Sequence, residues 1–147
     1  MAELEYFLVS ESVAIDRDTN ALSLFSVVEE LHVVDLPALL PRLAAISGWL
    51  LEDADIGKDY QATVVVRRPD GSEFLSMALN FTASRSRQRA VMRAEGFPFD
   101  SVGTWLFELL LNGAHKASHR ISVQKADPSL TEPTLMVNPK PLDPSRS

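Results

Sequence analysis

Two groups of oxygen-bearing side chains have the types that bind calcium. Asp16, Asp18 and Asn20 have the alternate spacing of the first half of a calcium loop, and calcium prefers carboxylate and amide oxygens. An EF-hand loop needs Gly at its sixth position and Glu at its twelfth, where this chain has Ala21 and Val27. The EF-hand match therefore fails. A calcium site would instead gather acids from two loops at one end of the fold, with six candidate ligands: Asp16, Asp18, Asn20, Asp53, Asp55 and Asp59.

The alternative for these acids is a set of solvated turn residues, because Asp and Asn are common turn residues. In that case the protein has no cofactor. Another group, of four arginines, could hold an anionic partner. If this segment is a strand, Arg85, Arg87, Arg89 and Arg93 form a one-sided basic stripe. Guanidinium groups bind carboxylates and phosphates through paired hydrogen bonds. Otherwise the arginines form a solvated sheet face and pair with nearby acids.

Other features of the sequence exclude several chemistries. The chain has no cysteine, which excludes disulfides, thiolate metal sites and a cysteine nucleophile. It has no G-x-S-x-G nucleophile motif, no phosphate-binding loop and no dinucleotide-binding glycine pattern. His115 and His119 would lie ~13 Å apart on one strand face, too far to share a metal ion. We therefore expect that the protein is not an enzyme.

The charge distribution limits the kinds of partner. The net charge is −6 and the isoelectric point is near 5.0. A nucleic-acid site needs a basic surface, so we expect no nucleic-acid partner. Residues 1–60 hold 12 acids and 3 bases, whereas residues 61–126 hold 5 acids and 9 bases. Either the two halves face each other and pair their charges, or they form a dipolar surface that steers a partner or supports self-association.

Alternating apolar residues predict short strands that would position these groups. The expected strands are Leu4–Ile15, Leu22–Leu31, Tyr60–Arg67, Phe74–Thr82, Arg87–Glu95, Trp105–Leu111 and a last strand marked by Ile121 and Val123. Turn residues separate them, most clearly Pro69-Asp70-Gly71 and Asn112-Gly113. A slip in the alternation near Phe25 and Val27 indicates a bulge.

The segment Leu43–Leu51 is ambiguous. We predict a strand there, with a short helix beginning at Pro41 as the alternative. A long connection, Leu31–Leu43, precedes it. In a simple meander, the turn at 16–20 and the acidic loop at 52–59 are the first and third connections. They would then be neighbours at one end of the fold.

Seven or eight short strands predict an all-β fold, an antiparallel β-sandwich of immunoglobulin-like or C2-like type. This domain covers residues 1–125. The composition changes at residue 126, because five of the nine prolines lie in the final 20 residues. We expect residues 126–147 to be a disordered Pro-rich tail. Its apolar residues are a candidate partner contact: Leu135, Met136 and Val137.

The N-terminal residues and the apolar runs bear on location. Glu3 and Glu5 stand where a secretory signal would carry bases, and the apolar stretch breaks at Ser10-Glu11-Ser12. The apolar runs are shorter than the ~20 residues of a membrane helix. We expect a cytoplasmic protein without a membrane span.

Three blocks of the sequence carry a family likeness. They are ESVAIDRDTNALSLFSVVEE (Glu11–Glu30), VVVRRPDG (Val64–Gly71) and FPFDSVGTWLFELLLNG (Phe97–Gly113). Over residues 4–125 the chain resembles a family of small bacterial proteins catalogued as a domain of unknown function. The third block is similar to the terminal hairpin of many immunoglobulin-like and C2-like sandwiches. The resemblance implies the fold and supplies no catalytic residues.

The sequence thus favours a non-catalytic binding or accessory module, and this inference rests partly on fold analogy. It would recognise an unknown protein through a sheet edge or a loop end, with the Pro-rich tail as a second contact. One alternative is a C2-like module that binds calcium or a small ligand with the acidic loops. A second alternative is a structural subunit of a homo-oligomer, which the separation of charge suggests.

Overall fold

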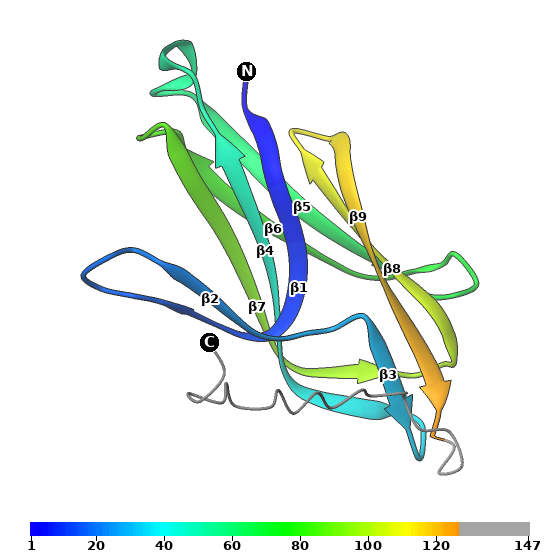
Figure 1. Cartoon of the computed structure of the whole chain (residues 1–147). Coiled ribbons are helices and arrows are strands. Elements are labelled where there is room, and N and C mark those ends of the chain that lie inside the picture. Colours follow the sequence, from blue (N-terminus) through cyan, green and yellow to red (C-terminus); the bar gives the residue numbers. More distant parts are fainter. Residues whose placement is uncertain (127–147) are drawn as a thin grey trace, which may run out of the picture.

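The computed structural model describes residues 1–126, which form nine β-strands and a short 3-10 turn at Asp53–Asp55. The strands are β1 (Glu3–Ile15), β2 (Leu22–Val27), β3 (Glu30–Val33), β4 (Ala38–Leu50), β5 (Asp59–Arg67), β6 (Glu73–Thr82), β7 (Arg87–Phe99), β8 (Gly103–Leu111) and β9 (Ala114–Lys125). One sheet has the order β2-β1-β4-β7 and the other the order β3-β9-β8-β5-β6. Figure 1 shows the two sheets facing each other. The predicted all-β sandwich is confirmed, with nine strands where seven or eight were expected.

Successive side chains alternate between the two faces of each sheet, and those that point inward form the core between the sheets. On β8, Trp105, Phe107 and Leu109 are buried, and the residues between them are partly exposed, because successive side chains of a strand point to opposite faces. An aromatic cluster joins the sheets, since Phe97 and Phe99 of β7 pack on Trp105, with Phe99 and Trp105 ring centroids 5.1 Å apart. Burial of these large rings is the main stabilising contribution.

The strand β4 lies in the middle of its sheet and is buried on both faces. Its residues Leu43–Trp49 are all buried, so the predicted strand over Leu43–Leu51 is confirmed. On the outer face, the ring of Tyr6 covers Gly48 so closely that a Cβ atom there would lie 2.3 Å from the ring. Glycine at this position therefore allows the close approach of an aromatic ring.

The strand β1 takes part in two pairings. Residues Glu3–Ser10 pair with β4, and residues Ser10–Ile15 pair with β2. Figure 1 shows the resulting β1–β2 hairpin (blue) projecting to the side of the sandwich. Its turn is closed by the N–H of Asn20, which donates to the carbonyl of Asp16 at 2.9 Å. The tip of the hairpin, at Asn20, contacts Arg89 of β7 at the other edge of the same sheet.

The predicted return strand Leu22–Leu31 is two strands in different sheets. Ser26 has a φ of 57°, and after β2 the chain crosses to form β3, which pairs in parallel with β9. The other strand pairs are antiparallel, as predicted. The slip in alternation near Phe25 marks this crossing. The long connection expected over Leu31–Leu43 was wrong, because β3 and β4 leave only residues 34–37 between them.

The simple meander was also wrong, because β4 returns beside β1 instead of following β3. Glu3 pairs with Leu50, so the 51–58 loop lies beside the start of β1. The turn at 16–20 follows the other end of that strand.

The two sequence halves face each other, as predicted, but they do not pair their charges. Three of the four strands of one sheet come from the first half, and four of the five strands of the other sheet come mainly from the second half. Among the side-chain ion pairs of residues 1–126, one joins the halves, between Glu5 and Arg87. The unequal charges of the halves are therefore mostly a property of the surface.

Candidate functional site

A basic hollow lies where the connection between β6 and β7 meets the tip of the β1–β2 hairpin. Its volume is about 480 Å³. The lining residues are Ile15, Asn20, Ser84, Arg85, Ser86, Arg87, Gln88 and Arg89. None of them is acidic, and three are arginines. The structure thus brings together three of the four arginines predicted to hold an anionic partner.

The connection that forms one wall of the basic hollow, residues 83–86, is fixed by the 51–58 loop. Three backbone hydrogen bonds of 2.8 or 2.9 Å join the two segments, donated by the N–H groups of Leu51, Gly57 and Ala83. They satisfy backbone groups that a short connection would otherwise leave unpaired. The position of this wall therefore depends on the shape of the 51–58 loop.

The side chain of Gln88 closes the same connection from the β7 side. Its Oε1 accepts the N–H of Ser84 at 3.1 Å, and its Nε2 donates to the carbonyl of Thr82 at 3.2 Å. Both contacts span the change of direction between the two strands. The backbone of Ser84, which lines the hollow, is thus fixed from the β7 side.

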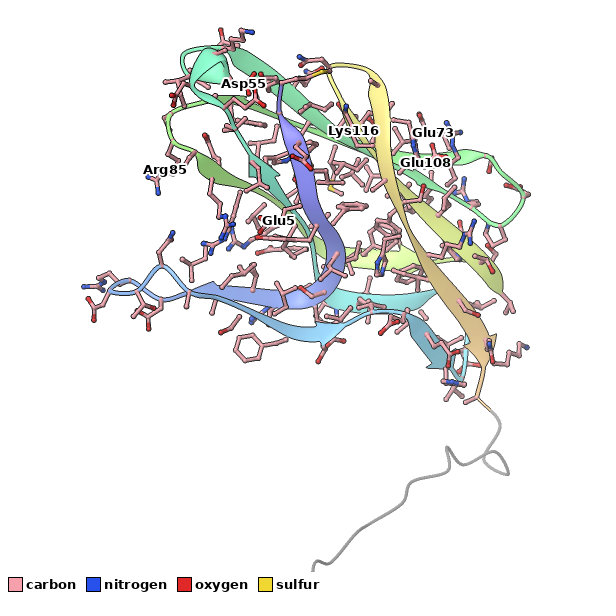
Figure 2. The ribbon with its side chains drawn as sticks, turned by 45° about the horizontal axis from the view of Figure 1, so that its top comes forward. Glu5, Asp55, Glu73, Arg85, Glu108 and Lys116 are labelled. Atoms are coloured by element: carbon pink, nitrogen blue, oxygen red, sulfur yellow. The ribbon has the colours of Figure 1, made fainter. Side chains whose placement is uncertain are left out.

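Two of the three arginines are held by residues of the β1 strand and its turn. Arg87 Nη2 lies 3.1 Å from Glu5 Oε2. Arg89 donates to both oxygens of Asn20, to the backbone carbonyl at 2.8 Å and to Oδ1 at 3.3 Å. Asn20 has a φ of 60°, a left-handed conformation that Asn tolerates better than most residues. Figure 2 shows Glu5 on β1 and Arg85 on the margin of the fold.

This arrangement suits electrostatic binding of an anionic segment. β7 is an edge strand, and the side chain of Arg87 is 70% exposed. Each guanidinium has five N–H donors, so one or two contacts to Glu5 or Asn20 leave donors for a ligand. Planar guanidiniums bind carboxylates in paired geometry.

Arg93 lies outside the basic hollow. It lines a second depression of about 280 Å³ together with Glu11, Arg42 and Glu95. Arg42 and Glu95 are in register across β4 and β7, so positive and negative charges alternate there. Arg87, Arg89 and Arg93 stand at alternate positions of β7, as predicted, but Glu11 of β1 and Glu95 of β7 lie beside Arg93 at the far end of this stripe.

The six predicted calcium ligands are not gathered in one place. Asp16 Oδ1 accepts the N–H groups of Thr19 and Asp18, both at 2.8 Å, and these bonds lower the pKa of Asp16. Asp59 Oδ1 accepts the hydroxyl of Thr82 at 2.6 Å. The other exposed members are Asp18, Asn20 and Asp53. Within residues 1–126, no group of three or more His, Cys, Asp or Glu side chains could hold a metal ion.

The sixth candidate, Asp55, is a buried residue that shapes the 51–58 loop. Its Oδ2 accepts the N–H of Glu52 at 2.9 Å, and its Oδ1 accepts the hydroxyl of Tyr60 at 2.9 Å. The ammonium group of Met1 lies 3.1 Å from the same Oδ1. The Glu52 N–H contributes most to lowering the pKa of Asp55 to about 2. Asp55 therefore stays charged near neutral pH and holds together the loop (Figure 2).

The arginines could be found from sequence, but the residues that hold them could not. Glu5 is distant from Arg87 in the chain, and nothing in its surroundings marks it. Asn20 ends a turn rich in Asp. This pattern favours a positive φ but does not indicate which residue Asn20 contacts. The predicted tail contacts Leu135, Met136 and Val137 lie outside the described residues.

Comparison with known proteins bears on the fold and gives no activity. A model of a family of unknown function, DUF6941, matches residues 5–124. No curated protein matches the chain. In residues 1–126, no helix is long and apolar enough to cross a membrane. The predicted resemblance to a domain of unknown function is confirmed.

Proposed function

We propose that this chain, which belongs to the DUF6941 family of unknown function, is a non-catalytic module that binds an acidic, extended segment of a partner protein. The basic hollow on the edge strand β7 would hold this segment. The observation that carries the proposal is the grouping of three arginines, without an acid among the lining residues. We place this role in the bacterial cytoplasm, an expectation that fractionation of the source cell would check.

The net charge of the hollow supports an acidic ligand. Glu5 neutralises Arg87, and Asn20 holds Arg89 without neutralising it. Arg85 and Arg89 therefore give the hollow a positive charge on a molecule whose net charge is −6. A local positive site on an acidic protein attracts an anionic segment at short range.

The spacing of the arginines favours a peptide over a small anion. Arg87 and Arg89 stand at alternate positions of a strand, which places their Cα atoms about 6.6 Å apart. Acidic residues at alternate positions of an extended peptide have the same spacing. Such a peptide can lie along β7 as an added strand, with main-chain hydrogen bonds to the free edge and carboxylates opposite the guanidiniums.

Binding can be tested with a fluorescein-labelled ten-residue peptide in which Glu alternates with Ser. We expect fluorescence anisotropy to show saturable binding that weakens as salt is added. The double variant Arg87→Glu, Arg89→Glu should lower the affinity at least about tenfold, because it places like charges opposite the peptide. The matched control is the double variant Arg120→Glu, Lys125→Glu, because it changes the net charge equally at two exposed residues of β9.

Two results would contradict the proposal. One is equal affinity of the β7 double variant and the β9 double variant, which would show that the peptide responds only to overall charge. The other is equal binding of a peptide with Lys in place of Glu. The variant Arg89→Lys separates the effect of charge from that of geometry, because lysine keeps the positive charge but cannot make the paired contact to Asn20.

A further inference from the structure

The strand β6 is a second free edge, and its side chains do not protect it. It ends the five-stranded sheet and pairs on one side only, with β5, from Leu75 opposite Val66 to Thr82 opposite Asp59. Edge strands usually carry a Lys, a Pro or a bulge that prevents pairing with another chain. β6 has no Lys, Arg, Pro or Gly, and the one shift in its register with β5, at Phe74, is near its start. Its one charged residue, Glu73, is at its start and in register with Arg67.

The other edges of the two sheets are less open to an uncharged strand. β7 carries arginines, and its Pro98 lacks the N–H that a pairing strand would need. β2 also has no charged residue, but it has six residues where β6 has ten, and Ser26 interrupts it with a positive φ. β3 has only four residues. Within residues 1–126, β6 is therefore the edge most open to an uncharged strand.

We propose that β6 pairs with β6 of a second copy of this chain, antiparallel about a two-fold axis at Ala78. This inference is independent of the proposed peptide site, because it uses a different strand and a different kind of partner. Cyclic two-fold dimers bring the same patch of each copy together. The two five-stranded sheets would then form one continuous sheet.

The sequence of β6 is compatible with itself in this arrangement. Around Ala78, Met77 would face Leu79 of the second copy, and Ser76 would face Asn80. These pairs match apolar with apolar and small polar with polar, and directly opposite pairs are the unit of sheet stability. No like charges lie opposite each other. A net charge of −6 per chain opposes most contacts between copies, so a neutral edge is the place where two copies can meet.

The half-buried row of β6 adds an apolar contribution. Leu75, Met77, Leu79 and Phe81 pack on the core but remain partly exposed. A second strand alongside would cover the free side of this row. The outward residues Ser76, Ala78 and Asn80 are exposed and small, so they allow the two backbones to approach.

Sedimentation velocity of the full chain, from micromolar to near-millimolar concentration, tests the proposal. We expect a monomer–dimer equilibrium. The variant Ala78→Lys should raise the dimer dissociation constant at least about tenfold, because two ammonium groups would meet at the axis. Ala78→Glu should do the same, and an equal mixture of the two variants should dimerise again. Thr104→Lys, exposed on the internal strand β8, is the matched control and should dimerise like the parent.

Three results would overturn the inference: a monomer at every concentration, an unaffected dimer of Ala78→Lys, or no recovery in the mixture. Equal melting temperatures of the variants and the parent would exclude misfolding, since Ala78 is exposed. The chain has no cysteine, so Ala78→Cys introduces a single thiol. A short thiol-reactive cross-linker should join two Ala78→Cys chains and should not join two Thr104→Cys chains.

Discussion

The edges formed by β6 and β7 differ in charge although the two strands follow each other in the chain. β7 presents Arg87 and Arg89 on its outer face and has Pro98 near its end. β6 has a single charged residue, Glu73, in register with Arg67. Both edges leave backbone groups unpaired by a neighbouring strand. The side chains therefore decide which partner can approach each edge, an anionic segment at β7 and an uncharged strand at β6.

The two edges also depend on common supports. β6 and β7 lie on the same side of the sandwich (Figure 1). Phe74 of β6 packs on Phe97 of β7, with ring centroids 5.4 Å apart. The connection 83–86 between the strands is held by the 51–58 loop. Variants of these supports should affect both edges, whereas variants of the edge residues should affect one edge only.

The largest effect is expected from Phe97→Ala. Phe97 contacts Phe74, Phe99, Trp105 and Phe107, so its removal leaves a cavity between β6, β7 and β8. We expect the free energy of unfolding to fall by about 3–5 kcal/mol, measured by urea denaturation. Phe97→Leu should lose much less, because it fills most of the space. A loss below about 1 kcal/mol for Phe97→Ala would show that the two edges do not share this support.

Tyr60→Phe should have the next largest effect. Tyr60 donates its hydroxyl to the buried Asp55, and loss of one partner of a buried group costs about 1–3 kcal/mol. The matched control is Tyr6→Phe, because the Tyr6 hydroxyl makes no hydrogen bond within the described residues and its ring lies on the outer face. We expect urea denaturation to show a clear loss for Tyr60→Phe and little change for Tyr6→Phe. Equal losses would contradict the role of the Asp55 contact.

Low pH should weaken the 51–58 loop, because Asp55 holds this loop as a charged carboxylate. The pKa of Asp55 is lowered to about 2, chiefly by the N–H of Glu52, whereas an unfolded Asp has a pKa near 3.9. Its contribution to stability is therefore complete above about pH 4 and is lost as the pH falls through about 2. Denaturation of Asp55→Asn between these pH values should show a smaller acid-dependent loss than the parent. If the free energy of unfolding falls equally with pH in both proteins, Asp55 does not change its pKa on folding.

The fold could be predicted where neighbouring residues determine it. Alternation on β5 and β8 needs only the burial of one face, and Asn112-Gly113 selects a tight hairpin turn, with both residues at positive φ as expected. The crossing after Ser26 could not be predicted, because the pairing of β3 with β9 depends on contacts between distant segments. The bend of β1 was missed for the same reason, since one strand pairs with two partners.

The candidate site divides in the same way. The arginines of β7 could be predicted to share a face, because alternate residues of a strand do so. The extent of the hollow could not, since Arg93 lines a different depression together with Glu11 and Arg42, which only the fold brings near it. The burial of Asp55 could not be predicted either, because Asp is rarely buried. Its burial depends on Tyr60 and Met1, which supply donors from other parts of the chain.

The smallest effect on stability is expected from Arg87→Gln. This variant distinguishes most clearly between peptide binding at β7 and dimerisation at β6. Arg87 pairs with Glu5 at the surface, with its side chain 70% exposed, and exposed ion pairs contribute about 0–1 kcal/mol. We expect the free energy of unfolding to change by no more than this, while binding of the alternating Glu peptide weakens and the sedimentation of the dimer is unchanged. A large loss of stability would mean that the arginines of β7 support the fold. A change in dimerisation would mean that the two edges are not independent.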